Sequence, residues 1–145
     1  MGLGGGPDMT EDGEVHEDNG KRKFDLLERL IQFACLIIDI VDSLAATRAG
    51  NHVAGQLVRC GTSPAANYAE AAGAESRRDF IHKSKVVLKE LRETNVWLEM
   101  TKRKDLCSRP LLVVTALAEC GELTAIFRTS VSTAERNLRR EATVE

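Results

Sequence analysis

The chain of 145 residues is long enough for one domain with a hydrophobic core, and its 4% aromatic content favours helices over sheets. Its formal net charge of −2 excludes a strongly basic protein. No apolar run approaches the roughly 18–20 residues that span a bilayer and no signal peptide pattern begins the chain, so we expect a cytoplasmic protein with no membrane partner.

The net charge hides a difference between the amino terminus and the rest of the chain. Residues 1–20 are rich in glycine and hold six of the 22 acidic residues but no Lys or Arg. The remaining residues carry 16 acidic and 20 basic side chains, a net charge of +4. We expect a disordered acidic tail over residues 1–21, a four-helix domain over 22–138 and a disordered tail over 139–145.

The first predicted helix, residues 24–45, carries two adjacent apolar seams with steps of three and four residues. One seam includes Ile31 and Ile38. A single seam is enough to face a bundle core, and large exposed apolar patches are rare, so we expect a second subunit to cover part of this arc. The alternative is that the arc packs between two helices of its own bundle. The residues that we assign to the interface are Leu30, Phe33, Ile37, Ile40 and Leu44.

Three more helices are predicted, over residues 52–73, 77–103 and 109–138. Gly73 is a plausible stop for the second helix, and Ser76 with Asp79 resembles a capping box at the start of the third. Pro110 is tolerated in a first helical turn. Four helices joined by short loops predict an all-α, antiparallel up-down-up-down bundle.

A polar stripe follows one face of the second predicted helix, in steps of 3, 4, 4 and 3 residues: Gln56, Arg59, Ser63, Asn67 and Glu70. The facing part of the third helix offers Lys83, Glu90 and Glu93. In an antiparallel hairpin Glu70 meets Lys83, and Arg59 meets Glu93 or Glu90, while Asn67 can satisfy Ser63. We interpret the set as a buried or half-buried polar ladder that fixes the register of the two helices.

Pro64 lies inside this stripe and cannot donate a hydrogen bond to the carbonyl of Cys60. The second helix therefore either kinks at Pro64 or breaks and restarts with Ser63 as its N-cap. We favour the kink, because the stripe keeps its helical phase across the proline.

The sequence offers no catalytic or metal-binding arrangement. Ser63 has no neighbouring His, and the stripe carboxylates lack the Glu-x-x-His pairs of di-metal bundles. The four cysteines, at positions 35, 60, 107 and 120, form no CxxC pair and are expected to be reduced and structural. The three histidines show no ligand spacing. We therefore expect no enzyme, metal or other cofactor.

Basic residues gather at both ends of the predicted bundle, where they are candidates for salt-sensitive contacts with nucleic-acid phosphates. One end collects Lys21, Arg22, Lys23, Arg77, Arg78, Arg136, Arg139 and Arg140. The other collects Arg48, Lys102, Arg103, Lys104 and Arg109. Acidic residues lie in the same segments, and solubility with helix-dipole complementation is the alternative interpretation.

Motifs on the second and third predicted helices resemble one known family: Gln56-x-x-Arg59-x-x-x-Ser63-x-x-x-Asn67-x-x-Glu70, Asp79-Phe80-x-x-Lys83 and Lys89-Glu90-x-x-Glu93-Thr94-x-x-Trp97-Leu98. This is the four helix bundle protein family, also called 23S rRNA intervening-sequence proteins. The resemblance covers about residues 22–132. Two features depart from it: Pro64 replaces the usual aliphatic residue, and the pI near 6.0 is low for a basic member.

The resemblance implies a bacterial cytosolic bundle assembled as a ring-like homopentamer. Most members have no known activity, and some are encoded within insertions in rRNA genes. A similar branch, the accessory variability determinants of diversity-generating retroelements, binds nucleic acid and a reverse transcriptase through a basic surface. We therefore expect a non-enzymatic adaptor that binds RNA, DNA or a nucleic-acid enzyme through its basic ends. The alternative is a protein-binding scaffold with no nucleic-acid role.

Overall fold

The computed structural model describes the backbone of residues 15–144 and the side chains of residues 25–144. Four helices form this part of the chain: α1 (Val15–Asp42), α2 (Arg48–Ala72), α3 (Arg77–Arg103) and α4 (Pro110–Val144). The prediction of an all-α chain with four helices is confirmed. The caps at the α2–α3 turn also form as predicted, with Gly73 ending α2 and the Ser76 side chain accepting a hydrogen bond from the Asp79 amide at 3.1 Å.

The helix bounds differ most from the sequence prediction at the two ends of the chain. Helix α1 begins at Val15, inside the predicted tail of residues 1–21, and the rest of that tail lies outside the described residues. The predicted disordered tail over 139–145 is wrong, because α4 continues to Val144. One ion pair lies in the extension: Arg77 reaches Glu141 at 2.9 Å, which ties this part of α4 to the start of α3.

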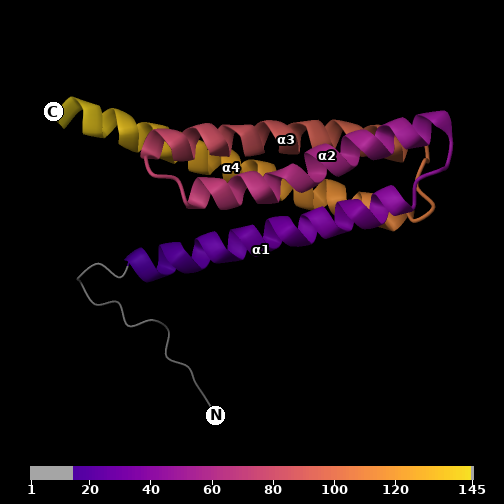
Figure 1. The fold of residues 1–145 in the computed structure, drawn as a ribbon, viewed down its shortest axis with the longest axis horizontal. Helices are drawn as coiled ribbons and strands as arrows, with labels where there is room; N and C mark the ends of the chain where they lie inside the picture. The colour runs from indigo at the N-terminus through magenta and orange to yellow at the C-terminus, as the bar shows by residue number, and fades with distance from the viewer. Residues whose placement is uncertain (1–14, 145) are drawn as a thin grey trace, which may run out of the picture.

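The four helices lie side by side along the long axis of the molecule, and the chain reverses direction at each connection (Figure 1). Contacts join α1 to α2, α2 to α3, α3 to α4 and, least extensively, α1 to α4. The bundle therefore has four faces, which we name by the helices that border them: α1/α2, α2/α3, α3/α4 and α1/α4. The α1/α2 and α3/α4 faces share no helix and lie on opposite sides.

The core corrects the predicted subunit interface. Leu30, Phe33, Ile37 and Ile40 are each at most 1% exposed, inside the protomer's own core, and Leu44 is half-buried against it. A side chain with no exposed surface cannot contact a second subunit, so assigning the first four of these residues to the interface was wrong, whereas the assignment of Leu44 stays a prediction. The α1 seam that was assigned to the interface packs in the core, and the other seam, which includes Ile31 and Ile38, faces outward.

Helix α2 continues through Pro64, which is buried, so the alternative of a break and restart is wrong, and the kink that we favoured stays a prediction. The hydroxyls before the proline bond backward within the helix: Thr62 donates to the carbonyl oxygen of Val58, and Ser63 donates to that of Arg59 at 2.6 Å. Ser63 is therefore no N-cap. Close packing against α1 occurs one turn earlier, at Gly61, where an added Cβ would lie 2.7 Å from Ile37 Cγ2.

Candidate functional site

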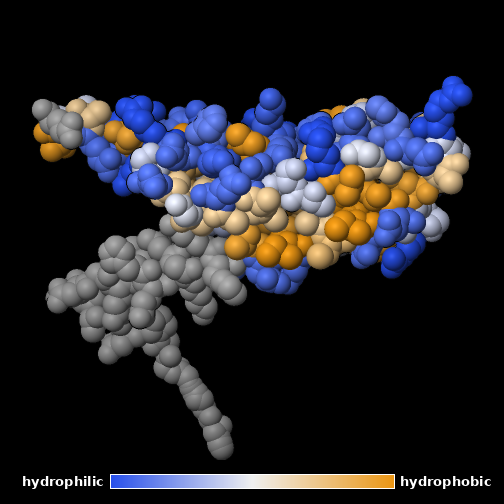
Figure 2. Space-filling model, in the orientation of Figure 1, coloured by the Kyte–Doolittle hydropathy of each residue, from blue (hydrophilic) through white to orange (hydrophobic). Residues whose placement is uncertain are grey.

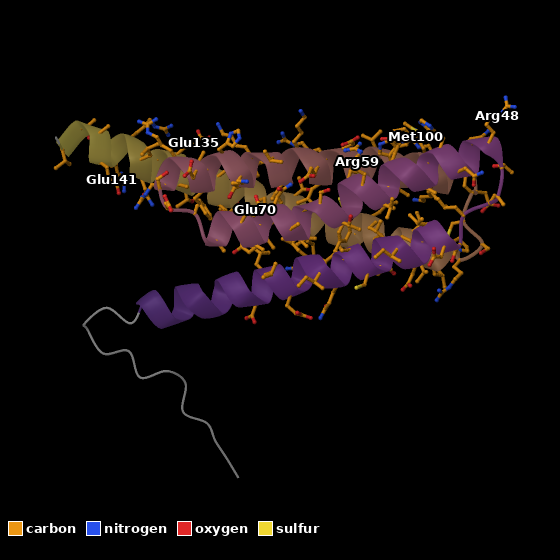
Figure 3. All side chains as sticks on the ribbon, viewed as in Figure 1. Arg48, Arg59, Glu70, Met100, Glu135 and Glu141 are labelled. Carbon is orange, nitrogen blue, oxygen red and sulfur yellow. The ribbon has the colours of Figure 1, made fainter. Side chains whose placement is uncertain are left out.

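The α2/α3 face carries the predicted polar ladder. Arg59 pairs with Glu93, and Lys83 pairs with Glu70, as the sequence predicts. Asn67 departs from the prediction, because its Nδ2 donates to Glu90 Oε1 at 2.8 Å and not to Ser63. Figure 3 shows Arg59 and Glu70 at separate levels of α2, so these pairs are spread along the face.

The ladder is more exposed than predicted, and its two central carboxylates differ in electrostatics. The Arg59 side chain is 53% exposed and that of Glu93 is 36% exposed. Burial raises the pKa of Glu90, although hydrogen bonds from Asn67 and Ser63 oppose the shift. The hydrogen bond from Arg59 lowers the pKa of Glu93. Gln56 completes the ladder by accepting a hydrogen bond from Arg59 at 3.0 Å, and both cations of the ladder are paired with carboxylates.

An exposed apolar patch lies on the α1/α2 face. Ile31 and Ile38 of α1 are each 41% exposed, and Val58 of α2 is 38% exposed. Figure 2 shows this hydrophobic surface over α1 and the adjoining part of α2. These α1 residues belong to the seam that the sequence analysis assigned to the core, so the heptad pattern found the apolar residues but placed them on the wrong side.

Further exposed apolar side chains lie on α3 and α4, and we name them together the second apolar patch. Val96 and Met100 of α3 and Leu111 and Val114 of α4 are all exposed, Leu111 by 80%. Sequence analysis missed this patch. The signal was available, because Leu111 and Val114 lie outside the buried helical seam of Val113 and Cys120.

Judged by length and composition alone, α4 is long and apolar enough to cross a membrane. This differs from the expectation that no segment of the chain is long and apolar enough to do so. Only 28% of its most apolar stretch is buried inside the protomer. Core helices meet the same test, so this one helix is weak evidence for a membrane span. It does show how much apolar surface α4 presents outward.

Charges near the two patches are of opposite sign. The exposed acidic residues of α1 with described side chains are Asp25, Glu28, Asp39 and Asp42. Across the bundle, Arg92 and Arg128 border a shallow groove between α3 and α4 that also includes Gly121 and Ala125. The two apolar sides of the bundle are therefore electrostatically unlike.

The α1/α4 face contains a charged contact that the sequence analysis missed. Arg29 donates from Nε to Glu119 at 3.1 Å and also pairs with Glu122 one turn along α4. The spacing of Glu119 and Glu122 predicts that they share one side of α4, but no sequence pattern identified Arg29 as their partner.

The basic residues at the end formed by the α2–α3 turn and the end of α4 are partly neutralised, since two of the five with described side chains form ion pairs. Arg77 pairs with Glu141, and Arg139 lies 3.9 Å from Glu135. Three exposed residues at this end form no ion pair within residues 25–144: Arg78, Arg136 and Arg140. The side chains of Lys21, Arg22 and Lys23 lie outside the described residues.

The opposite end, where the α1–α2 and α3–α4 loops meet, keeps more unpaired cations. We name it the loop end. Its basic residues are all exposed: Arg48, Lys102, Arg103, Lys104 and Arg109. Among the described residues, only Arg103 of this set forms an ion pair, with Glu99 at 3.4 Å. Figure 3 shows Arg48 at this end and Glu141 at the other.

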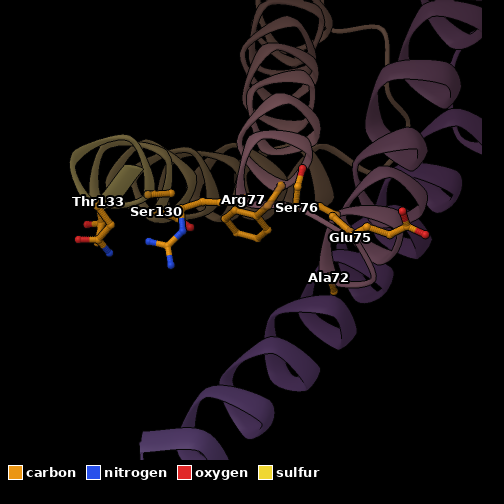
Figure 4. A pocket seen from close by; sticks show the side chains of 11 residues that line it. Ala72, Glu75, Ser76, Arg77, Ser130 and Thr133 are labelled. Carbon is orange, nitrogen blue, oxygen red and sulfur yellow. The ribbon is translucent and has the colours of Figure 1, made fainter. Parts of the chain in front are cut away.

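An open groove of about 690 Å³ lies between the α2–α3 turn and α4. Figure 4 shows Arg77 extending across it, with Ser130 and Thr133 on the α4 side and Ala72 on the α2 side. Arg77 is already paired with Glu141, and no group of three His, Cys, Asp or Glu residues suited to a metal ion occurs among the described residues. The groove therefore offers no evident reactive chemistry.

The cysteines are free, and three of them lie in the core. Burial raises the pKa of Cys120 to about 12, and its Sγ lies 3.2 Å from the carbonyl oxygen of Leu91. Burial also raises the pKa of Cys60. Thiols held in this protonated form are poor nucleophiles, so these residues act as small core side chains.

Comparison with known proteins gives one family. The model of the family described as 23S rRNA-intervening sequence protein matches residues 22–127. Among solved structures, the chain is similar to a protein of unknown function from the S23 ribosomal protein family of Bacteroides thetaiotaomicron. The two share 28% sequence identity and a TM-score of 0.68, over 76% of this chain and 97% of that one. The search among curated proteins gives no match.

Proposed function

Because the chain belongs to the 23S rRNA-intervening sequence protein family, we propose that it is a non-enzymatic adaptor built as a ring of identical up-down-up-down bundles. The observation that carries this proposal is the presence of two unlike apolar patches on opposite sides of one protomer. The ring gives the adaptor its shape, and its basic ends bind nucleic acid or a nucleic-acid enzyme.

The geometry of the patches favours a ring over a simple dimer. A two-fold dimer joins the same patch on both subunits, whereas two different patches join head to tail and close into a ring when the rotation allows. Ile31 and Ile38 on one subunit would pack against the side bearing Val96 and Val114 on the next. Burying the remaining surface of a side chain that is 41% exposed contributes about 0.6–1.2 kcal/mol.

Charge supports the same pairing. The acidic outer surface of α1 would meet the side of the neighbour that carries Arg92 and Arg128. Complementary charges of this kind fix orientation and disfavour the pairing of two α1/α2 faces, which would bring like charges together.

A mixing experiment tests the head-to-tail arrangement. One variant carries Ile31→Asp and Ile38→Asp, and the other carries Leu111→Asp and Val114→Asp. Each variant alone should be monomeric by light scattering, because one of its two surfaces is disabled. An equimolar mixture should form a dimer and stop there, because only one productive junction remains.

Two results would reject the ring. Wild-type protein that is monomeric at all concentrations would leave the apolar patches without a second subunit. Variants that stay monomeric when mixed, while wild type is oligomeric and both variants keep their helical circular dichroism, would show that the two patches do not bind each other.

A protein-binding scaffold without a nucleic-acid role is the second candidate, and the paired polar ladder on α2/α3 favours it as a ready surface for a partner. Binding of RNA and DNA to the intact oligomer over a salt series separates the two candidates. Affinity that falls steeply with salt supports the nucleic-acid adaptor. No binding at low salt, with the oligomer intact, supports the scaffold.

A further inference from the structure

We propose that the loop end, and not the opposite end, is the surface that binds the phosphodiester backbone of nucleic acid. This inference rests on the proposed function and assigns it to one of the two basic ends. The loop end comprises Arg48, Lys102, Arg103, Lys104 and Arg109, all of which are exposed.

Ion pairing distinguishes the two ends. At the loop end Arg103 pairs with Glu99 at 3.4 Å, and the other four cations have no ion-pair partner within the described residues, although Asp42 and Asp105 lie in the same loops. At the opposite end Glu141 pairs with Arg77 and Glu135 lies 3.9 Å from Arg139, so two of the five described cations are paired there against one of five at the loop end. A phosphate that approached that end would meet these two carboxylates beside its unpaired arginines.

Helix dipoles do not explain two of the loop-end cations. Lys102 and Arg103 lie in the last turn of α3, where a positive charge is favourable for folding. Arg48, in contrast, is the first residue of α2, and Arg109 directly precedes α4. A cation at a helix amino terminus opposes the dipole, and neither α2 nor α4 has an acidic residue in its first turn to compensate. Arg48 and Arg109 are therefore unfavourable for folding, but they lie at helix amino termini, where a bound anion is stabilised.

Backbone hydrogen bonds hold these loops together as a fixed platform. The amide of Ala45 donates to the carbonyl oxygen of Leu106 at 2.9 Å, and the amide of Ser108 donates to that of Ser43 at 2.8 Å. Leu44 and Cys107 form the bridge between the loops. The two loops that lead into α2 and α4 are thereby joined, so binding at the loop end needs little further ordering of these loops, which favours affinity.

The expected ligand is recognised by its charge and not by its sequence. The five basic side chains contact phosphates well but offer no ordered set of groups for reading base edges. In the ring each subunit would add its loop end to one rim, which multiplies the local field. We therefore expect salt-sensitive binding that differs little among nucleotide sequences.

Two matched triple variants test the assignment. The loop-end variant carries Lys102→Gln, Lys104→Gln and Arg109→Gln. The control variant carries Arg78→Gln, Arg136→Gln and Arg140→Gln, which removes the same charge from exposed residues at the opposite end. Fluorescein-labelled RNA and DNA duplexes of equal length are titrated over a salt series, and light scattering and melting temperature verify that each variant keeps its assembly and fold.

The loop-end variant should lose at least tenfold in affinity at low salt, and the slope of log K against log salt should become shallower by about 2–3. The control variant should bind like wild type. Equal losses in both variants, or a loss only in the control, would overturn the assignment while leaving nucleic-acid binding in place. Wild-type protein that binds neither duplex at low salt would instead overturn the nucleic-acid function itself, and this inference with it. The single tryptophan, Trp97, lies on α3 about two turns before Lys104 and offers an independent fluorescence signal.

Discussion

Substitution of Gly61 by alanine should destabilise the protein when residue 37 is isoleucine and stabilise it when residue 37 is alanine. A Cβ at Gly61 would lie 2.7 Å from Ile37 Cγ2, 2.8 Å from Cγ1 and 3.1 Å from Cβ. Ile37 is fully buried and β-branched, so its side chain has no free rotamer by which to move away. In wild type, overpacking costs about 1–3 kcal/mol, and the gain in helix propensity returns up to about 1 kcal/mol.

The Ile37→Ala background removes both close atoms and leaves a cavity. This change alone should cost about 2–5 kcal/mol. Adding Gly61→Ala then places a methyl group in the vacated space and gains helix propensity, so the double variant should be more stable than Ile37→Ala alone by about 1 kcal/mol. Gly61→Ala is therefore destabilising in one background and stabilising in the other.

Urea unfolding followed by helical circular dichroism measures this cycle, at one protein concentration because the proposed subunit association would contribute to stability. Gly55→Ala is the matched control: Gly55 is on the same helix, and an added Cβ there would meet nothing within 4 Å. It should gain up to about 1 kcal/mol in both backgrounds. If Gly61→Ala has the same effect with Ile37 and with alanine at that position, α1 and α2 do not approach as described and the reassignment of Ile37 to the core fails.

Four further substitutions have outcomes whose sign follows from the structure. Glu90→Gln should gain stability relative to wild type as pH rises, because burial raises the pKa of Glu90 and its ionisation therefore destabilises the folded state. Glu93→Gln should be less stable than wild type at neutral pH and equally stable in acid, because the pKa of Glu93 is lowered in the folded state. Melting temperatures from about pH 3 to 8 measure both, and parallel curves would contradict the assignment. Arg29→Met should cost about 0.5–2 kcal/mol at low salt, because its partner Glu119 is only 27% exposed, and less in 1 M salt, at which screening reaches a few Å. A loss independent of salt would point to packing instead. Gly50→Ala should lower the melting temperature sharply, because its Cβ would lie 1.9 Å from a backbone oxygen of the α1–α2 turn, and an unchanged melting temperature would show that the turn differs.

The sequence predicted the helices well, because periodicity and caps are local signals. Ser76 and Asp79 place the start of α3 at residue 77, as the structure has it. The polar ladder was also predictable, since Arg59 and Glu93 are at matching levels of two helices joined by a short turn. The α4 extension was not, because its ion pair joins Glu141 to Arg77, a residue on another helix and distant in the sequence.

The side of α1 that faces the core could not be read from α1 alone. Ile37 and Ile38 are adjacent and chemically identical, yet one is fully buried and the other is 41% exposed. The difference comes from Gly61 on α2, whose missing side chain lets α1 approach with Ile37 inward. A seam pattern gives two equivalent stripes, and only the shape of the partner helix selects between them.

The proposed ring assigns a direction to each remaining surface of the bundle. If subunits cover the α1/α2 and α3/α4 sides, then the α2/α3 and α1/α4 faces point toward and away from the ring axis, and the loop ends form one rim. Those two faces carry paired charges, Arg59 with Glu93 and Arg29 with Glu119, whereas the rim keeps unpaired cations. Paired charges interact weakly with a passing polyanion, and unpaired ones interact strongly. A nucleic acid bound to such a ring would therefore lie across the rim and not along its wall, so the loop-end variant should lose binding even when the ladder residues are intact.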